Sequence, residues 1–244
     1  MIVVDTDLSN PIHGLVIYFL AKLGKLNSVN LSLFQENEQA VKLAKCFSGD
    51  LDVSFCKVKN SVFGSWPDFR IKYSKNIKNE EKGILLGLSS AEGIRNLVDN
   101  KTEQIFFIGA EEKTLPFKVA KNIKKAPNDF IWCCSKYGSK MTFFKSDYGW
   151  SIKWRDIPYG NSVVSYLRDV VKNNFKNGID AVELIVAACS VWPELIIKIE
   201  KRDLKIHLVN GGYIFFDGEG DYSVVTKVNI EEIKKRVMEV LSGR

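Results

Sequence analysis

The sequence predicts an α/β protein with a mostly parallel central sheet, flanked by helices in a Rossmann-like arrangement, and antiparallel strands near the C-terminus. Short apolar runs alternate with helical patterns through the first two thirds of the chain. Such alternation indicates right-handed βαβ units, which place consecutive strands parallel in one sheet. The last third instead alternates apolar and polar residues, a pattern typical of antiparallel strands with one solvated face.

The N-terminal part shows this alternation most clearly. MIVV is apolar on both faces, as in a buried parallel strand. LVIYFLAKLGKL keeps apolar residues at helical spacing and has Gly24 near its end. We therefore expect strands at 1–4, 28–34 and 52–58, and helices at 11–26 and 36–47.

The middle of the chain continues the pattern after a polar stretch at 66–82. The apolar spacing predicts helices at 91–100 and 115–125, and strands at 103–110 and 128–135. Residues 137–160 are rich in glycine and aromatic side chains and follow no clean period. Helical spacing then returns at 162–175 and 180–192.

The tail favours two or three antiparallel strands, with turns at NGG (210–212) and DGEGD (217–221). A closing helix is expected at 230–241, where IEEIKKRVMEVL repeats apolar residues at helical spacing. No internal repeat or linker-like composition divides the sequence, so we expect a single domain over 1–244.

The composition is that of an ordinary globular protein, with 45% hydrophobic and 26% charged residues. The 35 Lys and Arg exceed the 29 Asp and Glu by six. This mild excess fits either a solvated basic face or an anionic partner such as RNA. The longest apolar stretch near the start, Gly14 to Ala21, is too short to cross a bilayer, so no membrane partner is expected.

Cysteine and histidine usage argues against a zinc site. The five cysteines form no CxxC pair, and the chain has two histidines. An odd number of cysteines without a signal-peptide pattern favours reduced thiols and a cytoplasmic protein.

Asp5 and Asp7 follow the first predicted strand directly. In open α/β sheets, ligands bind beyond the carboxyl ends of the parallel strands. Residues two apart on an extended segment point the same way, and two adjacent carboxylates repel unless a cation or a proton relieves them. A hard cation such as Ca²⁺ or Mg²⁺ suits such a pair. Alternatively, one aspartate caps the following helix and the other binds a loop amide.

Several stretches resemble the nucleoside hydrolase family of the inosine–uridine type. MIVVDTD before an apolar helix is similar to the family's opening strand and its Asp-x-Asp-Pro-Gly-x-Asp-Asp motif. Three later stretches are similar to later family segments in the same order: NLSLFQENEQAVKLA, FFIGAEEKTLPFKVA and GIDAVELIVAACSVWPEL. The resemblance implies the nucleoside-hydrolase α/β fold in a divergent and shortened member.

The resemblance also implies a reaction and roles for residues. In the family, Ca²⁺ holds the ribose hydroxyls and the attacking water, an aspartate takes the proton of that water, and the N-glycosidic bond breaks through an oxocarbenium-like state. Asp7 would be the general base and a calcium ligand, with the Thr114 backbone carbonyl and Asp180 as further ligands. Asp5 would support the metal or contact the ribose, and Asn37 would contact the sugar.

The chain departs from the family pattern at the metal site. Where the family has its second Asp pair, this sequence reads LSNPIHGL, which places Pro11 and Ile12 there, or His13 if one residue is inserted. None of these supplies a carboxylate to a cation that takes roughly six to eight oxygens. Ile179 stands where some members have a histidine that assists the leaving base, and 137–160 lacks the ribose-gripping elements.

Each candidate residue also has a structural interpretation. Asn37, Thr114 and Asp180 could each cap a helix, and His13 could be a packing residue at a helix start. Four aromatic side chains could stack on a base or belong to the core: Trp132, Trp150, Trp154 and Tyr159.

Two functions therefore remain open. The first is a hydrolase that cleaves the N-glycosidic bond of a ribonucleoside or related riboside with a calcium-activated water. The second is a catalytically inactive homologue that acts as a binding or assembly module, with a nucleic-acid or ribonucleoprotein partner that the basic surface would suit. Members of the family often form dimers or tetramers, so the resemblance also raises a homo-oligomer.

Overall fold

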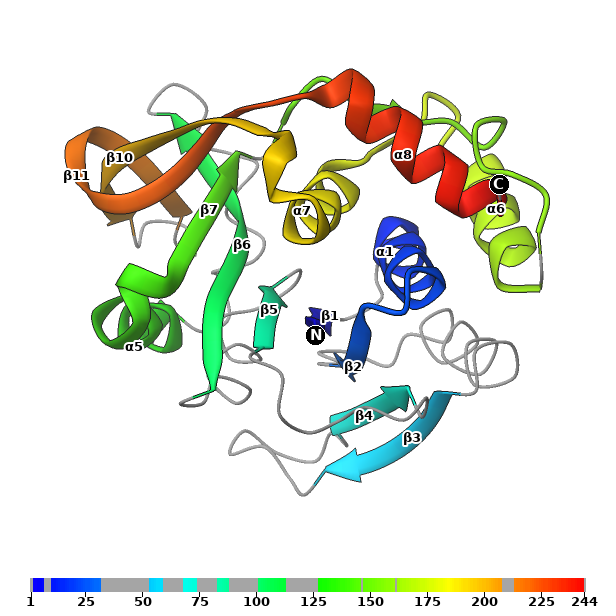
Figure 1. Cartoon of the computed structure of the whole chain (residues 1–244), viewed down its shortest axis with the longest axis horizontal. Coiled ribbons are helices and arrows are strands. Elements are labelled where there is room, and N and C mark those ends of the chain that lie inside the picture. The colour runs from blue at the N-terminus through cyan, green and yellow to red at the C-terminus, as the bar shows by residue number, and fades with distance from the viewer. Residues whose placement is uncertain are drawn as a thin grey trace.

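The computed structural model describes residues 2–6, 10–31, 53–58, 68–73, 83–87, 101–112, 127–145, 147–160, 162–207 and 213–243. Within these residues a nine-stranded sheet has helices on both faces, which confirms the predicted α/β class (Figure 1). In this part of the chain no helix is both long and apolar enough to cross a membrane.

The large sheet has a parallel centre and antiparallel edges. In chain order its strands are β1 (Ile2–Thr6), β2 (Leu26–Leu31), β3 (Val53–Val58), β4 (Asp68–Tyr73), β5 (Gly83–Gly87), β6 (Thr102–Glu112), β7 (Met141–Lys145), β10 (Ile196–His207) and β11 (Tyr213–Val228). Across the sheet, β11, β7, β6, β5, β1 and β2 are successive neighbours, and each is parallel to the next. The edges are antiparallel, with β10 beside β11 and with β4 and β3 beyond β2.

Helices cover the two faces unequally. The described helices are α1 (Pro11–Lys22), α5 (Pro127–Tyr137), α6 (Ser162–Asn174), α7 (Val182–Val191) and α8 (Ile230–Ser242), with 3₁₀ turns η1 (Gly138–Lys140) and η2 (Pro193–Leu195). Figure 1 shows α5 on one side of the sheet and α1, α7 and α8 on the other, with α6 outside α1. A separate two-stranded sheet joins β8 (Ser151–Ile152) to β9 (Ile179–Asp180).

Two apolar clusters correspond to these two faces. The larger one joins α1, α6, α7 and α8 to the sheet and contains Phe19, Leu86 and Val225, among many others. The smaller one lies under α5 and includes Cys133 and Phe143. At about 1.5–3 kcal/mol for each large side chain that is fully buried, the larger cluster supplies most of the hydrophobic stabilisation of the described part.

Helix α1 holds the end of β1 against the larger cluster. Its N-cap is Asn10, whose side-chain oxygen accepts a hydrogen bond from the Ile12 backbone N–H at 3.0 Å, and Pro11 occupies the first turn. Residues 11–21 are all buried, so the helix is apolar on every side. It ends before Gly24, which has φ +63° and starts the turn into β2.

The structure confirms the expected helices near 11–26, 162–175, 180–192 and 230–241 and the strands near 1–4 and 103–110. It contradicts the strand expected at 128–135, because this stretch belongs to helix α5. Cys133 and Cys134 are buried whereas Ser135 and Lys136 are exposed, which is a helical pattern. A short apolar run does not distinguish a buried strand from a helix, and Pro127 suits a helix start.

Two strands inside the sheet, β5 and β7, were not predicted from the sequence. β5 is the five-residue run GILLG, which lies between β1 and β6. β7 is MTFFK, inside the segment for which no period was found. Both are short strands in the middle of the sheet, where neither alternation nor a long run marks them.

The expected parallel pairing of the third strand is wrong. β3 does not pair with β2; it pairs antiparallel with β4, which lies in the polar stretch 66–82. The helices expected at 36–47, 91–100 and 115–125 lie outside the described residues, as do the NGG turn at 210–212 and part of the strand expected at 28–34.

DGEGD does not form the expected turn between strands, because β11 continues through it. Arg202 of β10 pairs with Tyr222 and Asp203 with Asp217, so four residues of β11 bulge out between adjacent pairs. A Cβ atom on Gly220 would lie 2.4 Å from the Asp203 backbone nitrogen. Glycine is therefore required where the bulge meets β10.

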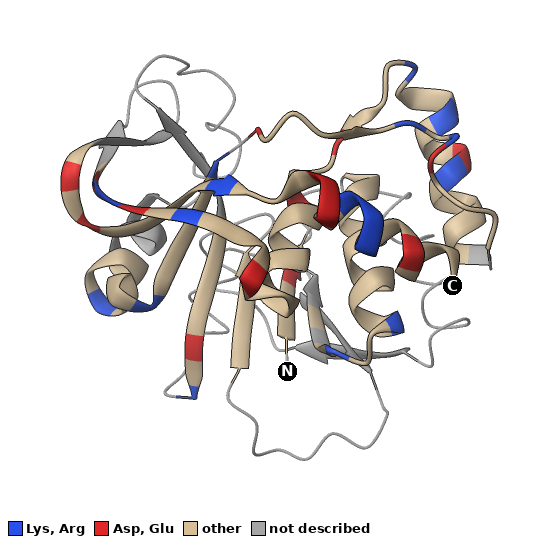
Figure 2. Cartoon of the chain, turned by 45° about the horizontal axis from the view of Figure 1, so that its top comes forward, with Lys and Arg blue, Asp and Glu red and all other residues tan. Residues whose placement is uncertain are grey.

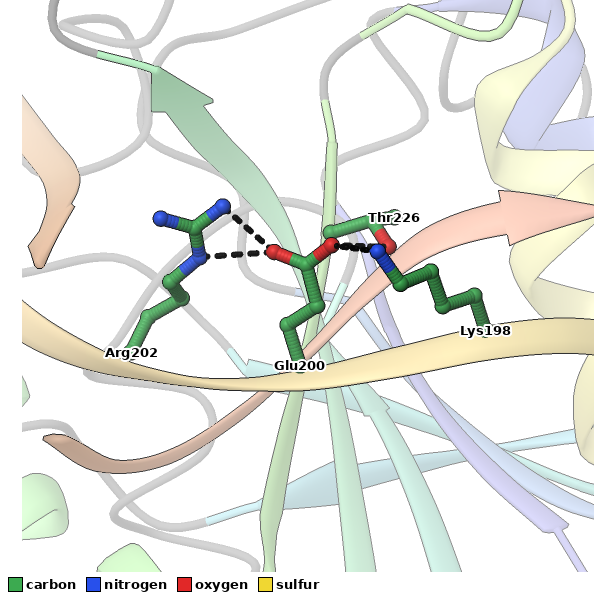
Figure 3. Close-up of polar contacts among 4 residues, drawn as sticks. All are labelled: Lys198, Glu200, Arg202 and Thr226. Carbon is green, nitrogen blue, oxygen red and sulfur yellow. Dashed lines mark hydrogen bonds and ion pairs between the residues drawn. The ribbon is translucent and has the colours of Figure 1, made fainter. Parts of the chain in front are cut away.

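Strand β10 carries a dense ion-pair cluster around Glu200 (Figure 3). Lys198 Nζ lies 2.6 Å from Glu200 Oε1, and Thr226 of β11 donates to the same oxygen at 3.3 Å. Arg202 donates to Oε2 through Nε at 2.8 Å and also through Nη2. The hydrogen bonds from Lys198 and Arg202 lower the pKa of Glu200 to about 2.

Candidate functional site

The polar residues at the end of β1 lie in the centre of the parallel sheet. Asp5 is in register with Asn30 of β2 and Gly87 of β5. Asp5 and Thr6 are both fully buried. Open α/β sheets bind ligands at the carboxyl ends of their strands. Asp5 is therefore the first candidate for a functional group.

His13 connects this strand end to helix α1. Its ring Nδ1 lies 2.7 Å from Thr6 Oγ1, and the residue is only 4% exposed. The other ring nitrogen, Nε2, lies 3.6 Å from Glu183 Oε1. These contacts fit a ring protonated at Nε2, in which the Thr6 hydroxyl donates to Nδ1 and the Nε2–H faces the carboxylate.

Glu183 brings helix α7 into the same group. It lies in the first turn of α7, where the helix dipole favours a negative charge. Asn10 Nδ2 donates to its Oε1 at 3.5 Å, so the residue that caps α1 also contacts α7. Glu183 Oε2 is buried, and it has no hydrogen-bond partner among the described residues. A buried carboxylate oxygen without a donor is destabilising unless something binds it.

We call Thr6, Asn10, His13 and Glu183 the polar chain, because these side chains follow one another from β1 through α1 to α7. Thr6 stands between Asp5 and Asp7 in the sequence. Its contact with His13 links the end of β1, where Asp5 lies, to helix α1. The chemistry available at this end of the sheet is that of carboxylates held by hydrogen bonds, with one imidazole between them.

Sequence comparison matches no protein-family model and no curated protein. Comparison with solved structures gives matches over almost the whole chain. A purine-preferring ribonucleoside hydrolase from Gardnerella vaginalis is 12% identical, with a TM-score of 0.67 over 100% of this chain and 98% of that chain. A plant nucleoside hydrolase is 14% identical (TM-score 0.66; 100% and 99%), and an inosine-guanosine nucleoside hydrolase is 11% identical (TM-score 0.67; 98% and 98%).

The chain has a nucleoside-hydrolase-like fold. This confirms the fold that the degenerate motifs implied, and Asp5 and Thr6 lie at the end of a central strand. In the nucleoside-hydrolase-like fold seen here, the carboxyl end of β1 meets the first turns of α1 and α7.

Two of the predicted site residues belong to the described part of this nucleoside-hydrolase-like fold. Asp5 lies at the end of β1, as expected, and Asp180 ends β9, opposite Ser151, with its side chain exposed. The alternative role of Asp180 as a helix cap is not seen, because the N-cap of α7 is Ala181 and no side chain caps it. The other three predicted site residues lie outside the described residues: Asp7, Asn37 and Thr114.

The donor chemistry at this end of the sheet suits a hard cation. Asp5 and the unpartnered Glu183 oxygen are carboxylate donors of the kind that Ca²⁺ takes, whereas both His13 nitrogens face protein groups. Among the described residues, no group of three His, Cys, Asp or Glu side chains is placed to hold a metal ion. Of the three predicted calcium ligands, only Asp180 lies within the described residues.

Sequence reasoning missed Glu183 and the contact of Asn10 with it. One signal was available, since Glu183 is the only charged residue in the apolar run AVELIVAAC. An acidic side chain within a helix that is otherwise apolar needs a polar partner or a ligand. Of the four aromatic candidates, Trp150 is buried in the larger cluster and Tyr159 is 85% exposed.

Proposed function

We propose that this protein hydrolyses the N-glycosidic bond of a ribonucleoside or a related riboside. The observation that carries the proposal is the fully buried Asp5 at the carboxyl end of the central strand β1. The fold supports it, since the three solved structures that align along nearly all of the chain are named nucleoside hydrolases. The substrate class proposed here is the nucleoside, without a choice of base.

In this proposal Asp7 takes the proton of the attacking water, Asp5 hydrogen-bonds a ribose hydroxyl, and Asn37 contacts the sugar. Asp7, Thr114 and Asp180 would hold calcium, which would supply Lewis-acid activation of that water when bound. The polar chain has a positioning role. His13 contacts Thr6, the residue after Asp5 at the end of β1, and so would hold this strand end in position.

The test is a panel of nucleosides incubated with the purified protein, with Ca²⁺ or with a chelator, and with the released base measured by chromatography. We expect base release that depends on calcium and falls by a factor on the order of 10² to 10⁴ in Asp7→Ala. Circular dichroism of the variant should match that of the unaltered protein. Unchanged turnover in Asp7→Ala, or no release from any nucleoside, would contradict the proposal.

A second function is favoured by the place of His13. The resemblance puts carboxylates where this chain has Pro11 and Ile12, or His13 if one residue is inserted, and their loss would weaken calcium binding. His13 contacts Thr6 and Glu183. The second proposal is an inactive homologue that serves as a binding or assembly module, with itself or with a nucleic-acid or ribonucleoprotein partner. Calcium titration by calorimetry separates the two functions. Heat that is lost in Asp7→Ala favours the hydrolase, and no heat up to millimolar calcium favours the module.

A further inference from the structure

Arg168 of α6 is a buried cation with an unused donor. The residue is only 8% exposed, and its Nε donates to the Trp154 backbone carbonyl at 3.2 Å. Its Nη1 is buried and has no hydrogen-bond partner among the described residues. A charged donor left unsatisfied in this way is costly, which indicates that a ligand completes it.

Aromatic rings hold this guanidinium in place. The Tyr159 ring centroid lies 3.5 Å from Arg168 Cζ, and the Trp154 centroid lies 5.1 Å away. Stacking uses the faces of the guanidinium, whereas its N–H groups point outward in its plane. The two rings therefore orient Arg168 without satisfying Nη1.

Two further cations gather at the same tryptophan. Arg155 Cζ and Lys172 Nζ each lie 5.3 Å from the Trp154 centroid, so the three positive groups are within roughly twice that distance of one another. This is about one Debye length at ordinary ionic strength, so they repel one another. Figure 2 shows blue on α6, at its upper right, and on the loop beside it.

The two carboxylates nearest to these cations in sequence, Asp156 and Asp169, do not pair with them. Asp156 accepts a hydrogen bond from the Lys153 backbone N–H at 2.8 Å, and Asp169 is exposed on α6. Within the described ranges, no carboxylate forms an ion pair with Arg155, Arg168 or Lys172. A multiply charged oxyanion would both accept from Nη1 and relieve the repulsion.

We propose that Arg168, Lys172 and Arg155 bind a phosphate group beside Trp154 at the base of α6. Phosphate fits better than a singly charged ligand, since three cations lie around Trp154 and Arg168 offers planar donors. Tyr159, which is 85% exposed, stacks on the face of the Arg168 guanidinium and lies where it could also contact an organic group that carries the phosphate. This site uses none of the residues assigned to nucleoside hydrolysis. The phosphate proposal can therefore be tested independently of the proposed function.

The experiment is calorimetric titration of the full chain at constant ionic strength. Inorganic phosphate tests the free ion, phenyl phosphate tests the same group on an organic carrier, and phenol serves as the control without phosphate. We expect both phosphates to bind and phenol not to bind. Affinity should fall about tenfold in Arg168→Lys, which loses the planar donors, and severalfold in Lys172→Ala. Lys176→Ala is the matched control beyond the end of α6 and should bind as the unaltered protein does.

Preferential loss of phenyl phosphate affinity in Tyr159→Ala would identify an organic phosphate as the ligand. If Arg168→Lys does not fold, the phosphate affinities of the exposed variants Lys172→Ala and Tyr159→Ala still test the site. The proposal is overturned if neither phosphate binds at tens of millimolar. It is equally overturned if Lys176→Ala loses as much affinity as Lys172→Ala, since binding would then reflect general charge.

Discussion

Glu183 in the polar chain and Glu200 on β10 are two glutamates in opposite situations. Glu200 receives close contacts from Lys198, Arg202 and Thr226, and both of its carboxylate oxygens have donors. Glu183 is more enclosed, with a side chain 12% exposed against 22%, yet its contacts are only 3.5–3.6 Å and Oε2 has no partner in the described part. Both carboxylate oxygens of Glu200 have donors at the edge of the sheet, whereas Glu183 keeps a buried oxygen without a donor in the described part.

The burial of a carboxylate and the number of hydrogen-bond donors to its oxygens are therefore separate properties. A partly exposed carboxylate can be fully paired, because lysine and arginine stems reach it along the surface. A buried one beside a strand end can be left short of donors, at a cost that folding elsewhere must offset.

The largest effect is expected from His13→Ala, which breaks the polar chain in its middle. Removing the ring takes a hydrogen bond from Thr6, removes the imidazole beside Glu183 and leaves a cavity at the start of α1. We expect a loss of about 2–4 kcal/mol in the free energy of unfolding, measured by urea denaturation. Lys198→Ala, at an exposed position in the Glu200 cluster of β10, is the control and should change the free energy of unfolding little. Equal losses of stability in His13→Ala and Lys198→Ala would show that the polar chain matters no more to folding than the Glu200 cluster.

Glu183→Gln should separate function from stability. The amide keeps the shape of the side chain but loses its charge, so His13 loses its anionic partner. In the proposed reaction we expect turnover to fall about 10- to 100-fold while the melting temperature stays within a few degrees. Glu200→Gln is the matched control and should retain turnover. Full activity in Glu183→Gln would show that the polar chain has no role in catalysis.

Tyr148→Phe should weaken the contact between strands β7 and β11. The Tyr148 hydroxyl donates to the Val225 carbonyl at 2.6 Å and accepts from the Lys145 N–H at 3.1 Å. Burial raises the pKa of this hydroxyl, which therefore stays protonated as a donor. We expect a cost of about 1–2 kcal/mol by urea denaturation, because both backbone groups lose a partner. A cost near zero would mean that water replaces the hydroxyl at both.

The smallest effect should be a change in acid sensitivity. The folded-state pKa of Glu200, about 2, lies below the ordinary value of 4.5 because Lys198 and Arg202 stabilise the carboxylate. Its contribution to stability is complete above pH 4.5 and is lost as the pH falls toward 2. Glu200→Gln should therefore show a flatter loss of stability over this range in urea titrations at several pH values. Identical acid profiles would mean that the pairing also persists in the unfolded chain.

The sequence was most informative where an element is long or strongly patterned. The periods of α7 and α8 and the long apolar run of β6 predicted those elements correctly. β5 and β7 are five-residue strands whose identity depends on neighbours far along the chain, so local pattern alone does not reveal them. The sequence predicts a strand where helix α5 lies, because the apolar run WCC fits a buried strand as well as a buried helix.

For the site, the sequence located Asp5 because the end of a predicted parallel strand is a defined place in such a fold. It did not connect Glu183 with His13, since that contact joins residues 170 positions apart and depends on how α1 and α7 pack. The same applies to Arg168, whose unsatisfied nitrogen is visible only once Trp154 and Tyr159 are in place.

The path of β11 has a consequence for how the protein folds. Its first half pairs with the end of β6, and its second half pairs with β7, where Val224 meets Phe143 roughly eighty residues away in sequence. Parallel pairing across such a separation raises the contact order and requires a long loop to close first. One edge of the parallel centre therefore remains open until the ribosome has released residue 225 and those around it. We expect slow refolding, with β7 exposed to intermolecular pairing until β11 arrives.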